Sequence, residues 1–103
     1  MSELTDLEMR LVEEYVWVLD FLSRCALGID RADWFYLHDK ANQLAAAAGR
    51  LSEVAREVYQ AANQGHPPRR EVVRAAVAVH GRHYRAGRLL HPVEPRRRGG
   101  GPR

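Results

Sequence analysis

The chain has 103 residues, enough for one small domain with a modest core. Cys25 is its single cysteine, which excludes an intrachain disulfide and a zinc site built from several cysteines, and favours a reducing, cytoplasmic setting. The N-terminus is acidic and the longest apolar run, 15–22, is far shorter than a membrane span, so we expect neither a leader nor a membrane segment.

The net charge of +3 divides unevenly along the chain. Residues 1–39 carry nine acids and three bases, whereas residues 40–103 carry four acids and thirteen bases. All of the basic residues except Lys40 are arginine, which suits phosphate or carboxylate recognition but is also what a GC-rich genome produces.

The first expected helix begins with a capping box formed by Thr5 and Glu8, in which each side chain bonds to the backbone of the other residue. Apolar residues then recur with the helical period as far as about residue 27. Gly28 follows as a natural left-handed stop. These signals predict a helix over about 5–27.

The middle of the chain carries nine residues at alternating three- and four-residue spacing, the pattern of a helix packed along another helix for about four heptads. We call this set the seam; it consists of Trp34, Leu37, Ala41, Leu44, Ala48, Leu51, Ala55, Val58 and Ala62. One edge of the seam consists almost entirely of alanines, and the other consists of large apolar side chains. With Asp30 as its cap, the seam predicts one long helix over about 30–64, with a break at Gly49 as the alternative.

The seam is longer than the first helix. About 23 residues reach roughly 35 Å, against roughly 50 Å for the second helix. The end of the seam near Val58 and Ala62 must therefore be covered by the third helix folding back, or by another chain.

The third expected helix begins at Pro67 or Pro68 and ends before Pro92. Its expected buried face is Val72, Val73, Ala76, Val79, His80, His83, Tyr84 and Leu90. Short loops make consecutive helices antiparallel neighbours. We therefore predict an all-α fold, a three-helix antiparallel bundle over 1–91 with a long central helix, followed by a basic, flexible and disordered tail rich in Arg, Gly and Pro over 92–103.

Trp17 lies on an otherwise polar stripe of the first helix, with Phe21 one turn further on. Aromatic side chains are typical interface anchors, although packing inside the bundle is the alternative. Together with the alanine edge they form the expected partner-binding set: Trp17, Phe21, Ala41, Ala48, Ala55 and Ala62. The leading interpretation is a small non-enzymatic interaction or regulatory protein that binds a protein partner or itself and needs no cofactor.

The second interpretation is a nucleic-acid-associated accessory protein. Arginines gather on one side of the third helix and in the tail, where they form a strip suited to a phosphate backbone. The candidate residues are Arg70, Arg74, Arg85, Arg88, Arg96, Arg97 and Arg98. The alternative is a solvated basic surface that balances the acidic first helix.

Enzymatic and metal-binding functions are remote alternatives. His80 and His83 lie three residues apart on one helix, but the usual helical zinc signature is absent. Arg74 and His80 have the loose spacing of the catalytic pair in helical HEPN-type ribonucleases, a match of two residues that establishes no resemblance. No catalytic set stands out, and so small a bundle has little room for a substrate pocket, so we expect neither an enzyme nor a metal site.

Overall fold

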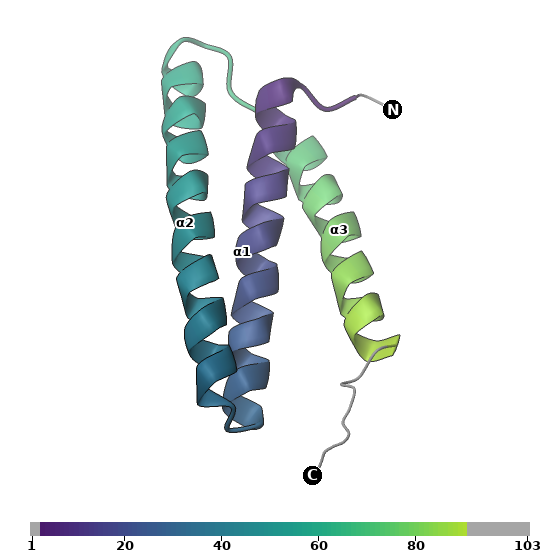
Figure 1. Cartoon of the computed structure of the whole chain (residues 1–103). Coiled ribbons are helices and arrows are strands. Elements are labelled where there is room, and N and C mark those ends of the chain that lie inside the picture. Colours follow the sequence, from purple (N-terminus) through teal and green to yellow (C-terminus); the bar gives the residue numbers. More distant parts are fainter. Residues whose placement is uncertain (1–2, 91–103) are drawn as a thin grey trace.

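The computed structural model describes the backbone of residues 3–90 and the side chains of residues 3–80. Over this range it contains α1 (Asp6–Asp30), α2 (Trp34–Asn63) and α3 (Arg70–Leu90). Consecutive helices run in opposite directions, so α1 and α3 point the same way (Figure 1). The all-α, three-helix fold and the long second helix are confirmed, whereas the expected tail over 92–103 lies outside the described residues.

The three helices form a flat layer with α1 in the middle. The extents are 55 × 28 × 15 Å, so the layer is little thicker than one helix. Within the described part of the chain α1 contacts both neighbours, but α2 and α3 do not contact each other (Figure 1). The third helix therefore does not fold back over the seam, and both broad sides of the α1–α2 pair stay uncovered.

The first helix begins as expected and ends later than expected. The Thr5 amide donates to Glu8 Oε1 at 2.9 Å and the Glu8 amide donates to Thr5 Oγ1 at 3.2 Å, which confirms the capping box. The prediction that Gly28 ends the helix is wrong, because α1 continues to Asp30. Gly28 instead lets the helices approach closely: a Cβ there would lie 3.2 Å from Leu37 backbone atoms.

The second helix is continuous through Gly49, so the alternative of two shorter helices is wrong. Its cap is Asp33, three residues beyond the expected Asp30, and Asp33 Oδ1 accepts from the Tyr36 amide at 3.0 Å. The left-handed residue in the α1–α2 turn is Ala32, with φ 54°. Gly65, with φ 85°, marks the end of the helix as expected.

The third helix starts at Arg70 and packs only against α1. Val79 and His80, which were expected on its buried face, are exposed because α3 has a single neighbouring helix. Among the described side chains, the buried apolar core is small and comes from α1 and α2: Val12, Val16, Phe21, Ala47 and Val54. None of the described helices is both long and apolar enough to cross a membrane.

Candidate functional site: the apolar face of α1 and α2

The seam meets α1 with one of its two edges. The large edge, Leu37, Leu44, Leu51 and Val58, is half-buried under α1. The alanine edge, Ala41, Ala48, Ala55 and Ala62, is exposed along its whole length. Contact with α1 is completed on the opposite flank of the large edge by Ala47 and Val54, which are buried. The apolar arc of α2 is therefore wider than one neighbouring helix can cover.

On α1, a column of large apolar residues at seven-residue spacing is also uncovered. Tyr15, Leu22 and Ile29 are 40%, 48% and 55% exposed. Residues seven apart on a helix lie nearly on one line, so this column runs along the side of α1 that adjoins the large edge of the seam. Trp34, 61% exposed, continues the alanine column of α2 toward the turn.

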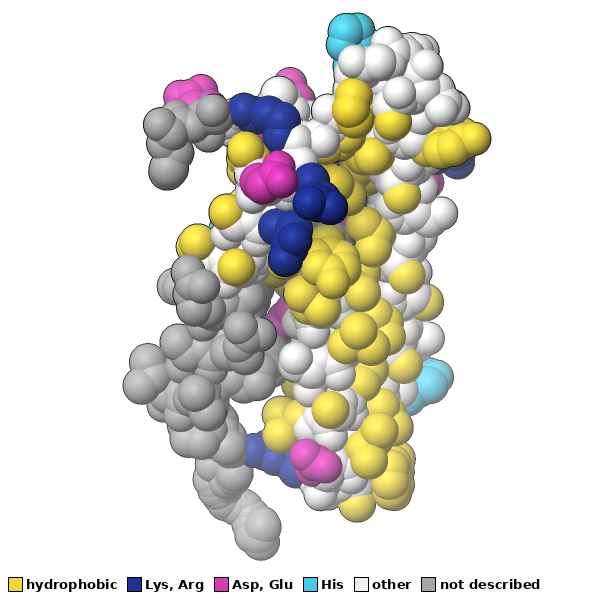
Figure 2. Space-filling view, turned by 180° about the vertical axis from the view of Figure 1, so that it is seen from behind, with side chains coloured by type: hydrophobic (Ala, Val, Ile, Leu, Met, Phe, Trp, Pro, Cys, Tyr) yellow, Lys and Arg dark blue, Asp and Glu magenta, His cyan; other side chains and the backbone are white. Residues whose placement is uncertain are grey.

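These residues make one continuous surface, which we call the apolar face. It comprises Leu11, Tyr15, Val18, Leu22, Cys25 and Ile29 of α1, and Trp34, Leu37, Ala41, Leu44, Ala48, Leu51, Ala55, Val58 and Ala62 of α2. Figure 2 views the molecule from this side, and hydrophobic side chains run from end to end along the α1–α2 pair. Charged side chains in that view gather toward the α3 edge and the lower end.

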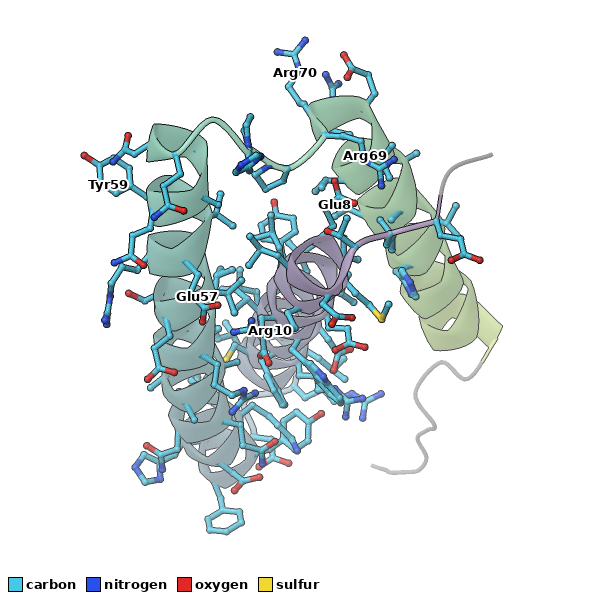
Figure 3. All side chains as sticks on the ribbon, turned by 90° about the horizontal axis from the view of Figure 1, so that it is seen from above. Glu8, Arg10, Glu57, Tyr59, Arg69 and Arg70 are labelled. Carbon is cyan, nitrogen blue, oxygen red and sulfur yellow. The ribbon has the colours of Figure 1, made fainter. Side chains whose placement is uncertain are left out.

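The opposite broad side of the α1–α2 pair is polar. Arg10 donates two hydrogen bonds to the carboxylate of Glu57, at 2.8 and 2.6 Å, and so links α1 to α2 (Figure 3). This contact lowers the pKa of Glu57. Arg50 Nε donates to Glu14 Oε1 at 2.9 Å, further along the same pair of helices. The two broad sides therefore differ sharply in chemistry.

Trp17 and Phe21 lie with the polar side. Trp17 is seven residues from both Arg10 and Arg24, so the three residues share one column of α1. The Trp17 and Phe21 rings stack with centroids 5.5 Å apart and an interplanar angle of 20°. Phe21 is buried within the α1–α2 contact and Trp17 is 42% exposed above it. The structure thus separates this pair from the alanine column with which the sequence grouped it.

Of the expected nucleic-acid-binding residues, the structure describes the side chains of Arg70 and Arg74 alone. Both are exposed on α3, and Arg70 lies 3.7 Å from the carboxylate of Glu71 (Figure 3 labels Arg70). Arg85 and Arg88 belong to α3 but their side chains are outside the described part, as are Arg96, Arg97 and Arg98.

Sequence reasoning identified Glu8 as a capping residue but missed its pairing with Arg69. Glu8 is 2% exposed, and it accepts from the Arg69 amide at 2.8 Å and from the Arg69 guanidinium at 2.9 and 2.6 Å. Arg69 also donates to the Glu3 carbonyl at 2.6 Å. These bonds, with the Thr5 amide, hold the pKa of Glu8 far below its usual range. The capping box predicted a role for Glu8, but nothing in the sequence indicated that Arg69, 61 residues away, is its partner.

This cluster holds the start of α3 against α1, as Figure 3 shows from above. Beyond it the α1–α3 contact is open on both flanks. A hollow of about 530 Å³ lies between Leu11 and Tyr15 of α1 and Val73, Arg74, Val77 and Ala78 of α3. A second, of about 460 Å³, is lined by His80 together with Met9, Val12 and Glu13. No group of metal-binding side chains occurs among the described residues.

Comparison of the chain with protein-family models, with curated proteins and with solved structures gave no match. Any proposal about function therefore rests on the geometry of the chain itself.

Proposed function

We propose that this chain is a small, non-enzymatic interaction protein that binds a protein partner through the apolar face. The observation that carries the proposal is the exposure of large apolar side chains on the same side as the alanine column. Tyr15, Leu22, Ile29 and Trp34 are between 40% and 61% exposed. Isolated exposed side chains of this kind are ordinary, but these form a continuous surface.

The size of the surface supports the same conclusion. α1 has 25 residues, which corresponds to a length of about 37 Å, and two packed helices are together roughly 20 Å wide. The apolar face thus covers roughly 700 Å² in projection, above the few hundred square ångströms that monomers ordinarily expose. A partner that covers it removes this surface from water.

The proposal is tested by photo-crosslinking in the native host. p-Benzoylphenylalanine is introduced at Ala48, in the middle of the apolar face, and at Ala46 as a matched control. Ala46 is also exposed, but it lies two residues away on the far side of α2. We expect protein crosslinks from position 48 in clear excess over position 46.

Equal crosslinking from the two positions would refute the proposed docking face. Nucleic acid that co-purifies with the chain, together with equal crosslinking from the two positions, would favour the arginine-rich surface as the working site instead.

A further inference from the structure

We propose that the partner on the apolar face is a second copy of this chain, arranged as a two-fold dimer with α1 and α2 of both copies in a four-helix core. The inference rests on the proposed function, because it concerns the same face. It is carried by three observations: the chain has one apolar broad side, the exposed residues on that side are divided by size between the two helices, and the area suits a dimer.

The presence of one apolar side and one polar side favours a closed pair. The layer is 15 Å thick, so its two broad sides are separate surfaces. The polar side carries the Arg10–Glu57 and Arg50–Glu14 pairs, which leave its charges solvated. A chain with a single self-complementary surface forms a two-fold dimer and stops there, since no second surface remains for growth.

The apolar face is complementary to itself in size. Its exposed large side chains stand mainly on α1, at Tyr15, Leu22 and Ile29. Its exposed small side chains stand on α2, in the alanine column. A two-fold axis parallel to the helices places α1 of each copy over α2 of the other. Large residues then meet alanines on both halves of the interface, and each helix has antiparallel neighbours, as in up-and-down four-helix bundles.

The register along the helices also matches. Arg10 binds Glu57 and Gly28 contacts Leu37, which fixes the residues that lie side by side in α1 and α2. A two-fold axis along the bundle keeps every residue at its own height, so the same register applies between α1 of one copy and α2 of the other.

On this register the large side chains fall opposite gaps in the alanine column. Leu22 lies at a height between Ala41 and Ala48, and Tyr15 at a height between Ala48 and Ala55. Both columns repeat every seven residues. Leu22 and Tyr15 therefore each enter a space between two alanines of the partner, as knobs enter holes, whereas Ile29 lies at a height between Trp34 and Ala41.

The area agrees with the size of a stable dimer. The face of roughly 700 Å² is close to the value of about 800 Å² per partner that specific interfaces bury. α3 leaves this surface open, because it contacts α1 on the other flank and does not reach α2.

The first experiment is sedimentation velocity on the full chain at about 100 μM, which populates complexes with micromolar dissociation constants. We expect twice the monomer mass of 11.7 kDa. Ala48→Glu should give a monomer, because it buries a carboxylate in the contact, whereas the matched Ala46→Glu should remain a dimer. Circular dichroism should show that both variants are folded, since both positions are exposed in the single chain.

The second experiment tests the pairing of helices with the native thiol. Wild-type chain is mixed with the double variant Cys25→Ser/Ala41→Cys and oxidised. Because α1 should face α2 across the dimer, we expect the mixed disulfide between Cys25 and the introduced thiol to exceed both symmetric disulfides. A predominant Cys25–Cys25 disulfide would show that α1 faces α1, and would overturn the proposed arrangement.

The failure of this inference is distinguishable from the failure of the proposed function. A wild-type monomer at about 100 μM, with crosslinks from position 48 to a different polypeptide, would refute the dimer and support the apolar face as a docking surface. A monomer without preferential crosslinks at position 48 would overturn both.

Discussion

α1 has two neighbours, and it holds them by different physical means. Against α2 it packs along its length, with buried Phe21, Ala47 and Val54 and with close approach at Gly28. Against α3 it makes a contact flanked by hollows on both sides and fastened by the buried Glu8 carboxylate on Arg69. The α1–α2 pair is therefore held by apolar packing, and the attachment of α3 adds a buried ionised group to its apolar contacts.

The two contacts should therefore respond to different disturbances. Apolar burial is insensitive to pH and is broken by polarity or by misfit volume in the contact. A buried ion pair is broken by removing either charge, because the remaining charge stays unpaired away from water.

Val54→Asp should break the α1–α2 contact. Val54 is 4% exposed, so the new carboxylate would be buried without a partner, at a cost of about 3–5 kcal/mol. That is a large share of the stability of a domain this small, and we expect most of the chain to unfold in urea titrations followed by circular dichroism. Ala46→Asp, exposed on the same helix, should change the midpoint little. Equal urea midpoints for the two variants would contradict the apolar contact between α1 and α2.

Glu8→Gln should release α3 and leave the α1–α2 pair folded. The amide keeps the size of the side chain but loses the charge that binds Arg69 in three hydrogen bonds. We expect amide-exchange protection in α3 to fall by roughly 100-fold, with α1 and α2 largely unchanged outside the first turn of α1.

The control for Glu8→Gln is Glu57→Gln, which also removes a carboxylate paired with an arginine. The Arg10–Glu57 pair is solvent-exposed on both sides, so its loss should have little effect. Matching losses of α3 protection in the two variants would show that burial of Glu8 is unimportant for holding α3.

Acid should detach α3 from the wild-type chain. The folded-state pKa of Glu8 is lowered, chiefly by the hydrogen bonds from Arg69, so the stabilisation is complete above the ordinary value of 4.5 and is lost as the pH falls below it. Hydrogen exchange at stepped pH, corrected for intrinsic rates, should show constant α3 protection at pH 5–7 and a decline below 4.5. In Glu8→Gln this decline should be absent; if it persists there, another group is responsible.

Gly28 of α1 and Gly49 of α2 provide the smallest and most closely matched comparison. A Cβ at Gly49 meets nothing within 4 Å, so Gly49→Ala should stabilise the chain by about 0.5–1 kcal/mol. At Gly28 the same methyl lies 3.2 Å from backbone atoms of Leu37, so the gain should be cancelled or reversed. We expect Gly28→Ala to be less stable than Gly49→Ala by about 1–2 kcal/mol in urea denaturation. Equal midpoints would show that the helices can separate freely at Gly28.

Features determined by neighbouring residues were predictable from the sequence. The Thr5–Glu8 capping box and the unbroken heptad pattern across Gly49 predicted the start of α1 and the continuity of α2 correctly. The prediction of Asp30 as the cap of α2 was wrong and the cap is Asp33, because α1 continues past Gly28 and moves the turn along the chain. A glycine between two helices signals a stop and a close approach equally well, and only the position of Leu37 decides between them.

Features determined by distant residues were not predictable. The heptad pattern showed that α2 packs against another helix, but the apolar arc includes both Ala47 and Ala48. Which alanine faces α1 depends on the rotation of α2, and α1 covers Ala47 and leaves Ala48 exposed. Likewise, the partner of Glu8 was one arginine among fifteen, and helical periodicity does not distinguish Arg69 from its neighbours.

The distance in sequence between Glu8 and Arg69 has a consequence for the order of folding. The α1–α2 turn spans residues 31–33, so the first two helices pair through contacts that are close in sequence. The α3 clamp joins residues 61 positions apart and needs a much longer loop to close. On a growing chain the α1–α2 hairpin is therefore complete before Arg69 can reach Glu8, and its apolar face is already formed when α3 is still being made.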